Sequence, residues 1–394
     1  MKYTTINVAA LPLAVAMATA SYAQTFEPAA VYVGAFDVTP TVKVNVQEDD
    51  NIFLQVSGSE TSSTVTIVQP AFSAVADDGV TRYRVSYELE DGTYDDTVNS
   101  DYTDHQLSAG FDWRIDVRNL LELKTNYRRD HDDRSADSVT SLGAADLNEY
   151  KDRDFSAGYT YGAPESRGRI SVNYRTQNLD YTTNLADTSV LESDSDTVDG
   201  SFSVAVGAVT RVVAQVVERS TDFPNDSVQN RDDSSFFVGA DWEVTGLTSG
   251  SVRVGQTDSD LVNASGNDSS STTGSVSISW APYEYSKWTL LSSQSVENSE
   301  NDVGSFVDRA SLGVSLDHQW SDTFSMNVSI TQRDDDFVGA NRSDESLASQ
   351  IGFNYVIRRW VTVGLSFSQV DKDSSDAAFT YDRNITRLSF SASL

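Results

Sequence analysis

Ten lysine and arginine residues are the side chains best placed to act on a dissolved solute, because they fall on one face of the segments that carry them. The chain has a formal net charge of −31, so cations gathered on one face amount to a separation of charge. Like charges around a narrow passage focus the electric field, and the pattern therefore predicts a wall that favours anionic or hydroxyl-rich solutes. The ten residues are Lys43, Arg82, Arg84, Arg114, Lys124, Arg128, Arg169, Arg175, Arg253 and Arg387.

The same cations have a second interpretation that involves no solute. Acidic residues are predicted on the same face, at Glu88, Asp112, Glu122, Asp241 and Asp317. Ion pairs between the two sets would stiffen the wall and select nothing. The sequence leaves both interpretations open.

Metal and catalytic chemistry have weaker support. The chain has no cysteine, and its three histidines, His105, His131 and His318, are far apart, which argues against thiol chemistry and most zinc sites. No stretch has the spacing of an EF-hand, a G-x-S-x-G elbow, a phosphate loop or an H-E-x-x-H pair. We predict no enzyme activity, no catalytic residue, no cofactor and no dedicated metal site. Carboxylates expected in solvated loops could still share divalent cations with lipopolysaccharide phosphates, namely Asp130, Asp132, Asp133, Asp194, Asp196, Asp199, Asp334, Asp335 and Asp336.

The elements that carry these residues are predicted β-strands. Over 361–368, Val361, Val363, Leu365 and Phe367 alternate with small polar residues, and 350–357 shows the same period of two. One face is apolar with aromatics at the strand ends, while the other is Ser, Thr, Asn, Gln and Gly. A strand between lipid and a wet interior has this composition, whereas a soluble sandwich packs two apolar faces together.

Repetition of this unit predicts the fold class: an all-β, antiparallel, up-and-down transmembrane barrel of about eighteen strands. Short turns alternate with longer acidic connections such as 130–149 and 180–199. Barrels of this kind have short periplasmic turns and long external loops, so both termini are expected in the periplasm. The segment 211–218 does not alternate cleanly, and its faces cannot be assigned.

Aromatic residues occur where two interfacial girdles would need them, close to the short turns. Their rings are apolar, yet the N–H or O–H group still reaches water at the edge of a bilayer. The residues are Trp113, Tyr161, Trp242, Trp280, Trp288, Trp320 and Trp360.

The N-terminal segment reads as an export signal. Residues 1–23 combine Lys2, an apolar run and a small-residue cleavage site that ends at Ala23. A periplasmic lead-in at 24–37 and a barrel at 38–394 follow, which places the mature chain in the outer membrane of a Gram-negative bacterium, in contact with lipid and lipopolysaccharide. The acidic composition argues against nucleic acid as a partner.

Pro40, the alternating residues after it, and the run from Asp49 to Phe53 (Asp-Asp-Asn-Ile-Phe) together resemble the opening of the putative β-barrel porin 2 family. Members of that family are often associated with exopolysaccharide or capsule loci. The resemblance therefore implies a channel for polysaccharide export, served by periplasmic export components. A general or solute-selective diffusion porin is the first alternative, and a structural or adhesive surface barrel is the second.

Overall fold

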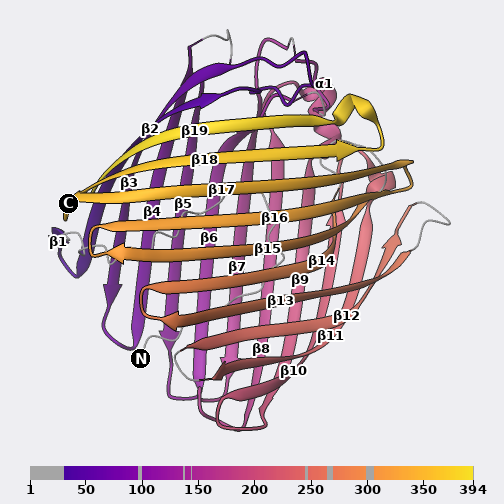
Figure 1. Cartoon of the computed structure of the whole chain (residues 1–394). Coiled ribbons are helices and arrows are strands. Elements are labelled where there is room, and N and C mark those ends of the chain that lie inside the picture. The colour runs from indigo at the N-terminus through magenta and orange to yellow at the C-terminus, as the bar shows by residue number, and fades with distance from the viewer. Residues whose placement is uncertain are drawn as a thin grey trace.

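The chain forms one closed antiparallel barrel. The computed structural model describes residues 31–95, 100–135, 138–142, 144–244, 247–263, 269–298 and 306–393. Within them each strand from β2 to β19 pairs with the next along the chain, and β19 pairs back with β2, so the sheet has no free edge (Figure 1). These eighteen barrel strands confirm the predicted fold class. They are β2 (Phe36–Asp49), β3 (Ser63–Asp77), β4 (Thr81–Tyr94), β5 (Tyr102–Arg114), β6 (Asn119–Asp132), β7 (Asn148–Tyr161), β8 (Gly168–Tyr181), β9 (Ser193–Ala205), β10 (Thr210–Asp222), β11 (Arg231–Val244), β12 (Thr248–Leu261), β13 (Ser269–Tyr283), β14 (Ser286–Glu297), β15 (Phe306–Ser321), β16 (Phe324–Val338), β17 (Arg342–Arg358), β18 (Val361–Ser374) and β19 (Tyr381–Ser393).

A short extra strand precedes the barrel. β1 (Val31–Val33) turns back onto the start of β2 through Gly34, whose φ of 64° is a left-handed conformation that suits glycine. β1 lies inside the segment predicted as a lead-in, and β2 starts two residues before the predicted barrel boundary at Val38. The predicted signal segment and its cleavage site lie outside the described residues.

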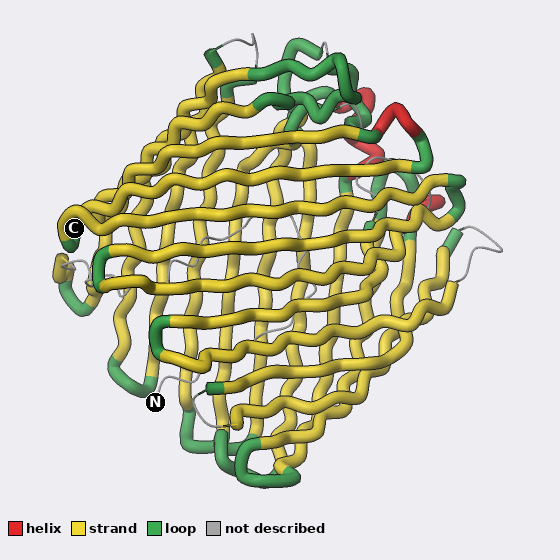
Figure 2. Tube along the Cα trace, viewed as in Figure 1, coloured by secondary structure: helices red, strands yellow, loops and turns green. Residues whose placement is uncertain are grey.

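The two ends of the barrel differ in their connections. One end has tight turns, and the other has the longer connections, which contain α1 (Leu185–Thr188), η1 (Ser189–Leu191), η2 (Ser227–Gln229) and η3 (Ala377–Phe379). Figure 2 shows these helical turns gathered at the end of the barrel opposite the C-terminus. We call the two ends the short-turn end and the long-connection end. None of the described helices has the length and apolarity needed to cross a bilayer.

Aspartates shape the short turns. In the turn between β5 and β6, the Asp116 carboxylate accepts the backbone N–H groups of Arg118 at 2.7 Å and Asn119 at 3.0 Å. It also accepts the Asn119 side-chain amide at 2.7 Å. These hydrogen bonds favour the charged form, and they lower the pKa of the Asp116 carboxyl. Such local bonds close a turn without help from a distant residue.

The outer face of the barrel is apolar and exposed. On β18, Leu365 and Phe367 are 39% and 44% exposed, and the small residues between them turn inward. β10 resolves the irregular run of valines, since Val212 and Val216 are exposed while Val213 is buried. A belt of this kind around the whole sheet is far larger than the apolar patches that soluble proteins tolerate, so its natural neighbour is lipid.

The strands run further toward the long-connection end than the sequence indicates. Of the carboxylates predicted in loops, only Asp133 lies outside a strand. Asp130 and Asp132 belong to β6, Asp194, Asp196 and Asp199 to β9, and Asp334, Asp335 and Asp336 to β16. Aspartate has a low strand propensity, but cross-strand partners compensate for it here, as where Ser220 donates to Asp232 at 2.7 Å.

Candidate functional site

The inner wall of the barrel is the candidate functional site. Its side chains alternate with the exposed apolar ones. On β12, Val254 is 54% exposed on the outside, while the residue before it, Arg253, reaches Asp241 of β11 at 2.7 Å. The strand period of two therefore places the predicted cations on the face opposite the apolar belt.

Two rows of uncharged polar side chains follow the inner face from strand to strand. Each hydroxyl or amide group can both donate and accept hydrogen bonds, so a row offers a hydroxylated solute many equivalent partners without charge. The β3–β6 polar row consists of Ser73, Ser86, Ser108 and Asn126, which are successive Cα partners. The β14–β18 polar row consists of Thr289, Ser315, Ser329, Gln350 and Ser368, which are also successive partners.

Most of the predicted cations are bound to carboxylates. Arg84 donates to both oxygens of Asp112, at 2.6 and 2.8 Å, in a fork that fixes the guanidinium plane. Six of the ten cations have an acidic partner within 4.0 Å: Arg82 with Asp77, Arg84 with Asp112, Lys124 with Glu122, Arg128 with Asp152, Arg175 with Asp154 and Arg253 with Asp241. The pairing interpretation thus accounts for Asp112, Glu122 and Asp241. The structure adds Asp77, Asp152 and Asp154, which the sequence analysis did not assign as partners.

The other four cations have no carboxylate within 4.0 Å among the residues that the structure describes. Arg387 donates instead to the Gln47 side-chain oxygen at 2.9 Å, and Arg114 makes a long contact of 3.5 Å with the backbone oxygen of Gly79. Lys43 and Arg169 complete the set. These four basic groups lie on the inner face without a described carboxylate to offset them.

An arginine row at the short-turn end contains a residue that the sequence analysis missed. Arg169 on β8 faces Ser203 on β9 in the register, and Arg211 on β10 donates to the Ser203 hydroxyl at 3.3 Å. The neighbour of Arg211 across β11 is Asp241, which Arg253 already occupies. Arg211 was missed because the valines around it hide the period of two.

Buried ion pairs line the wall near the long-connection end, and these were missed as well. In two of them the arginine and the aspartate are two residues apart on the same strand. That Arg-x-Asp spacing puts both side chains on one face and is a signal readable in the sequence. The pairs are Arg231 with Asp233, Arg309 with Asp335, Arg342 with Asp344, and Arg383 with Asp49, at 2.9, 2.7, 2.6 and 2.6 Å.

The seven aromatic residues predicted for the two girdles lie at one end of the barrel. Trp113, Tyr161, Trp280, Trp288, Trp320 and Trp360 are 40% to 62% exposed. Trp242 is half-buried and lies over Gly250, where an added Cβ would meet its ring at 2.4 Å. All seven lie in the short turns or the adjoining strand ends, so they can contribute to one interfacial girdle and not to two.

The run from Asp49 to Phe53 closes the barrel. The buried Asp49 carboxylate accepts the Arg383 guanidinium of β19, and Asp50 accepts the backbone and side-chain N–H groups of Asn384 at 2.7 and 2.8 Å. The Asn51 amide donates at 2.8 Å to the backbone oxygen of Asp382. We call this set of contacts the seam clasp. The motif therefore joins the first barrel strand to the last.

Solved outer-membrane proteins share this architecture at low sequence identity. Pseudomonas aeruginosa OccK2 (OpdF) has a TM-score of 0.52 and 10% identity over 91% of this chain and 98% of its own. Pseudomonas aeruginosa OpdQ has a TM-score of 0.49 and 10% identity over 91% and 97%. The FrpB iron transporter of Neisseria meningitidis has a TM-score of 0.48 and 11% identity over 85% of this chain, which spans only 62% of the FrpB chain. The likeness to OccK2 is one of fold alone.

Sequence comparison adds a family. None of the curated proteins matches the chain by sequence. The family model described as Putative beta-barrel porin 2 matches residues 24–393, which include every described strand. By this match the chain is a member of the Putative beta-barrel porin 2 family.

Proposed function

We propose that the barrel is a passive outer-membrane channel for hydroxyl-rich sugar polymers, through which exopolysaccharide or capsular polysaccharide leaves the cell. The observation that carries this proposal is the composition of the inner wall, where rows of uncharged polar side chains run between ion pairs in which most of the charges offset each other. The β3–β6 and β14–β18 polar rows present hydroxyl and amide groups, and ion pairs remove most of the predicted positive charge.

The charge pattern favours neutral sugars over a general anion pathway. An arginine that is already held by a carboxylate focuses little field into the passage, because the two charges cancel at a distance. The cations without a described carboxylate partner act as separate positive groups that can hold an acidic substituent of a polymer. They are Lys43, Arg114, Arg169 and Arg387, together with Arg211, which lies near Arg169. A uniform basic ring would instead select small anions.

We also propose a location and partners for the barrel. The signal is cleaved near Ala23, and the barrel then resides in the outer membrane of a Gram-negative bacterium. Its apolar belt contacts lipid and lipopolysaccharide, and periplasmic export components deliver the polymer to the short-turn end. The family resemblance supports the polymer, and the alternation of short turns with longer connections supports the orientation.

Deletion of the gene, with complementation, tests the transported species. Under the proposal, surface polysaccharide is lost and the intact gene restores it, while uptake of small solutes is unchanged. Slower uptake with normal surface polysaccharide would establish a diffusion porin instead. A change in attachment alone would establish a structural or adhesive barrel.

Purified protein in planar bilayers tests the role of the wall. Oligosaccharide added from the short-turn side should interrupt the current reversibly, and replacing Ser315 and Ser329 with valine should shorten the interruptions several-fold. Thr272→Val is the matched control, because Thr272 is an exposed residue of β13 whose neighbour Thr273 is buried. Equal interruptions in both variants would refute a role for the β14–β18 polar row.

A further inference from the structure

We propose that Asp104, Asp130 and His131 form a binding site for one divalent transition-metal ion at the long-connection end of the barrel. One ligand atom from each side chain lies within 4.8 Å of the other two. The His131 Nδ1 atom is 2.9 Å from an Asp104 oxygen and 3.9 Å from an Asp130 oxygen. An ion placed among the three could contact all of them after small side-chain rotations.

Neighbouring strands bring the three residues together. His105 of β5 is the Cα partner of Arg129 of β6, so Asp104 and Asp130 come next in the two strands, side by side at the top of the ladder. β6 leaves that ladder after Arg129, and this departure lets His131 turn toward Asp104. The two carboxylates and the imidazole thus converge from the neighbouring ends of β5 and β6.

The imidazole is held in place by its surroundings. The His131 ring lies 4.1 Å from the Tyr102 ring, centroid to centroid, and its side chain is only 9% exposed. The Tyr102 hydroxyl donates to Glu90 at 2.6 Å, which fixes the phenol ring in turn. A ligand oriented by such second partners loses little freedom when it binds an ion.

The local charge calls for a cation. Asp104 and Asp130 lie together. Among the described residues, His131 is the only basic side chain within 4.0 Å of either carboxylate. The arginines that precede them in β6 are already occupied: Arg128 pairs with Asp152 and Arg129 with Glu149. Adjacent carboxylates that are removed from water repel each other, and a divalent ion would compensate both charges at once.

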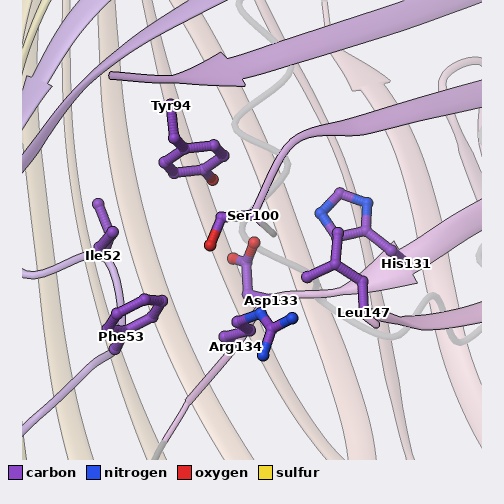
Figure 3. Close-up of a pocket in the computed structure, with 8 residues that line it drawn as sticks. All are labelled: Ile52, Phe53, Tyr94, Ser100, His131, Asp133, Arg134 and Leu147. Carbon is purple, nitrogen blue, oxygen red and sulfur yellow. The ribbon is translucent and has the colours of Figure 1, made fainter. Parts of the chain in front are cut away.

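A small cavity beside His131 provides the second observation. It measures about 10 Å³, and Ser100, Asp133 and His131 are among the residues that line it (Figure 3). Ser100 is only 5% exposed, and its hydroxyl oxygen has no hydrogen-bond partner among the described residues. A buried hydroxyl without a partner is costly, so this cavity suits a polar guest such as a water molecule beside His131, the proposed ligand that lines it.

The donor set indicates the class of metal. One imidazole nitrogen and two carboxylate oxygens suit first-row ions such as Zn²⁺ and Mn²⁺, whereas Ca²⁺ and Mg²⁺ prefer oxygen ligands alone. A nitrogen ligand therefore separates this site from the many exposed aspartates of the chain, which attract any cation weakly.

The test is metal titration of the full barrel in detergent, with Zn²⁺ by calorimetry and Mn²⁺ by electron paramagnetic resonance. The wild type should bind one equivalent above the weak background and unfold at a higher temperature when loaded. His131→Ala and Asp104→Asn should each lower the affinity for that equivalent by about tenfold or more.

His105→Ala is the matched control. Its ring accepts or donates one hydrogen bond at 2.8 Å to the Tyr87 hydroxyl, and it belongs to no group of metal-binding side chains in the described part of the chain. This variant should bind as the wild type does. If His131→Ala does not fold, Asp130→Asn replaces it. Equal binding in all variants, or no saturable binding by the wild type, would overturn the proposal.

Discussion

The seam clasp allows a quantitative prediction about barrel stability. We consider Arg383→Met, which keeps an unbranched, flexible side chain but removes the guanidinium and its charge. The variant leaves the Asp49 carboxylate, whose side chain is 1% exposed, without the guanidinium that contacts it at 2.6 and 3.0 Å. Asp49 keeps one hydrogen bond, from the Asn51 backbone N–H at 3.1 Å.

The expected cost follows from this geometry. Removing one partner of a buried ion pair destabilises a protein by about 3–5 kcal/mol, which is roughly two to three and a half orders of magnitude in the unfolding equilibrium constant. We expect the lower end of that range, because Arg383 is 20% exposed and Asn51 still satisfies Asp49 in part. Arg153→Met is the control: Arg153 and Asp180 pair at 2.5 Å with side chains 50% and 41% exposed, so its loss should cost less than about 1 kcal/mol.

Urea unfolding of the barrel from lipid vesicles, followed by tryptophan fluorescence, measures both values. The double variant Asp49→Asn with Arg383→Met should recover much of the loss, because it leaves no buried charge. If Arg383→Met is no more destabilising than Arg153→Met, the buried pair does not hold the seam and the reasoning is wrong.

Three further predictions concern the turns, the sheet and the girdle. The pKa of Asp116 is lower in the folded barrel than in the unfolded chain, so its contribution to stability is complete above the unfolded-state pKa and is lost as pH falls through the folded-state pKa. The stability difference between wild type and Asp116→Ala should therefore shrink from pH 6 to pH 3. A constant difference would contradict the role assigned to Asp116. Gly255→Ala should lower the yield of folded barrel and reduce the free energy of unfolding by about 1–3 kcal/mol, because the new Cβ would lie 1.9 Å from the Phe236 backbone oxygen. Gly200→Ala should be tolerated, because its new Cβ would have no atom within 4 Å. Equal yields and stabilities for the two variants would count against this packing. Lipids brominated near the headgroup should quench the tryptophan emission more than lipids brominated near the ends of their acyl chains, since all six tryptophans lie by the short turns. The reverse order would contradict an interfacial girdle.

Strand existence and orientation could be predicted from the sequence because the period of two acts locally. Leu365 and Phe367 alternate with serines, and that pattern alone assigns their faces. Strand ends were harder. Aspartates such as Asp194 and Asp335 have a low intrinsic strand propensity, and the partners that keep them in strands come from a neighbouring strand whose register the sequence does not state.

The charge state of the wall could be predicted only in part for the same reason. Arg84 and Asp112 were both assigned to the inner face, but whether they meet depends on the offset between β4 and β5. Arg169 was assigned to the same face and has no carboxylate within 4.0 Å in the described part of the chain, because its register neighbour is Ser203. A shift of two residues between strands would exchange such outcomes without altering the alternation that the sequence displays.

The clasp between Asp49 and Arg383 joins positions 334 residues apart, and this separation has a consequence for biogenesis. The strands between them can pair in sequence, each with the one before it. The sheet nevertheless keeps two unpaired edges until the last strand pairs with the first. During that interval the polypeptide is most vulnerable to pairing with another copy. Both edges therefore stay open to mispairing until closure, and a lesion in the clasp should lengthen that interval.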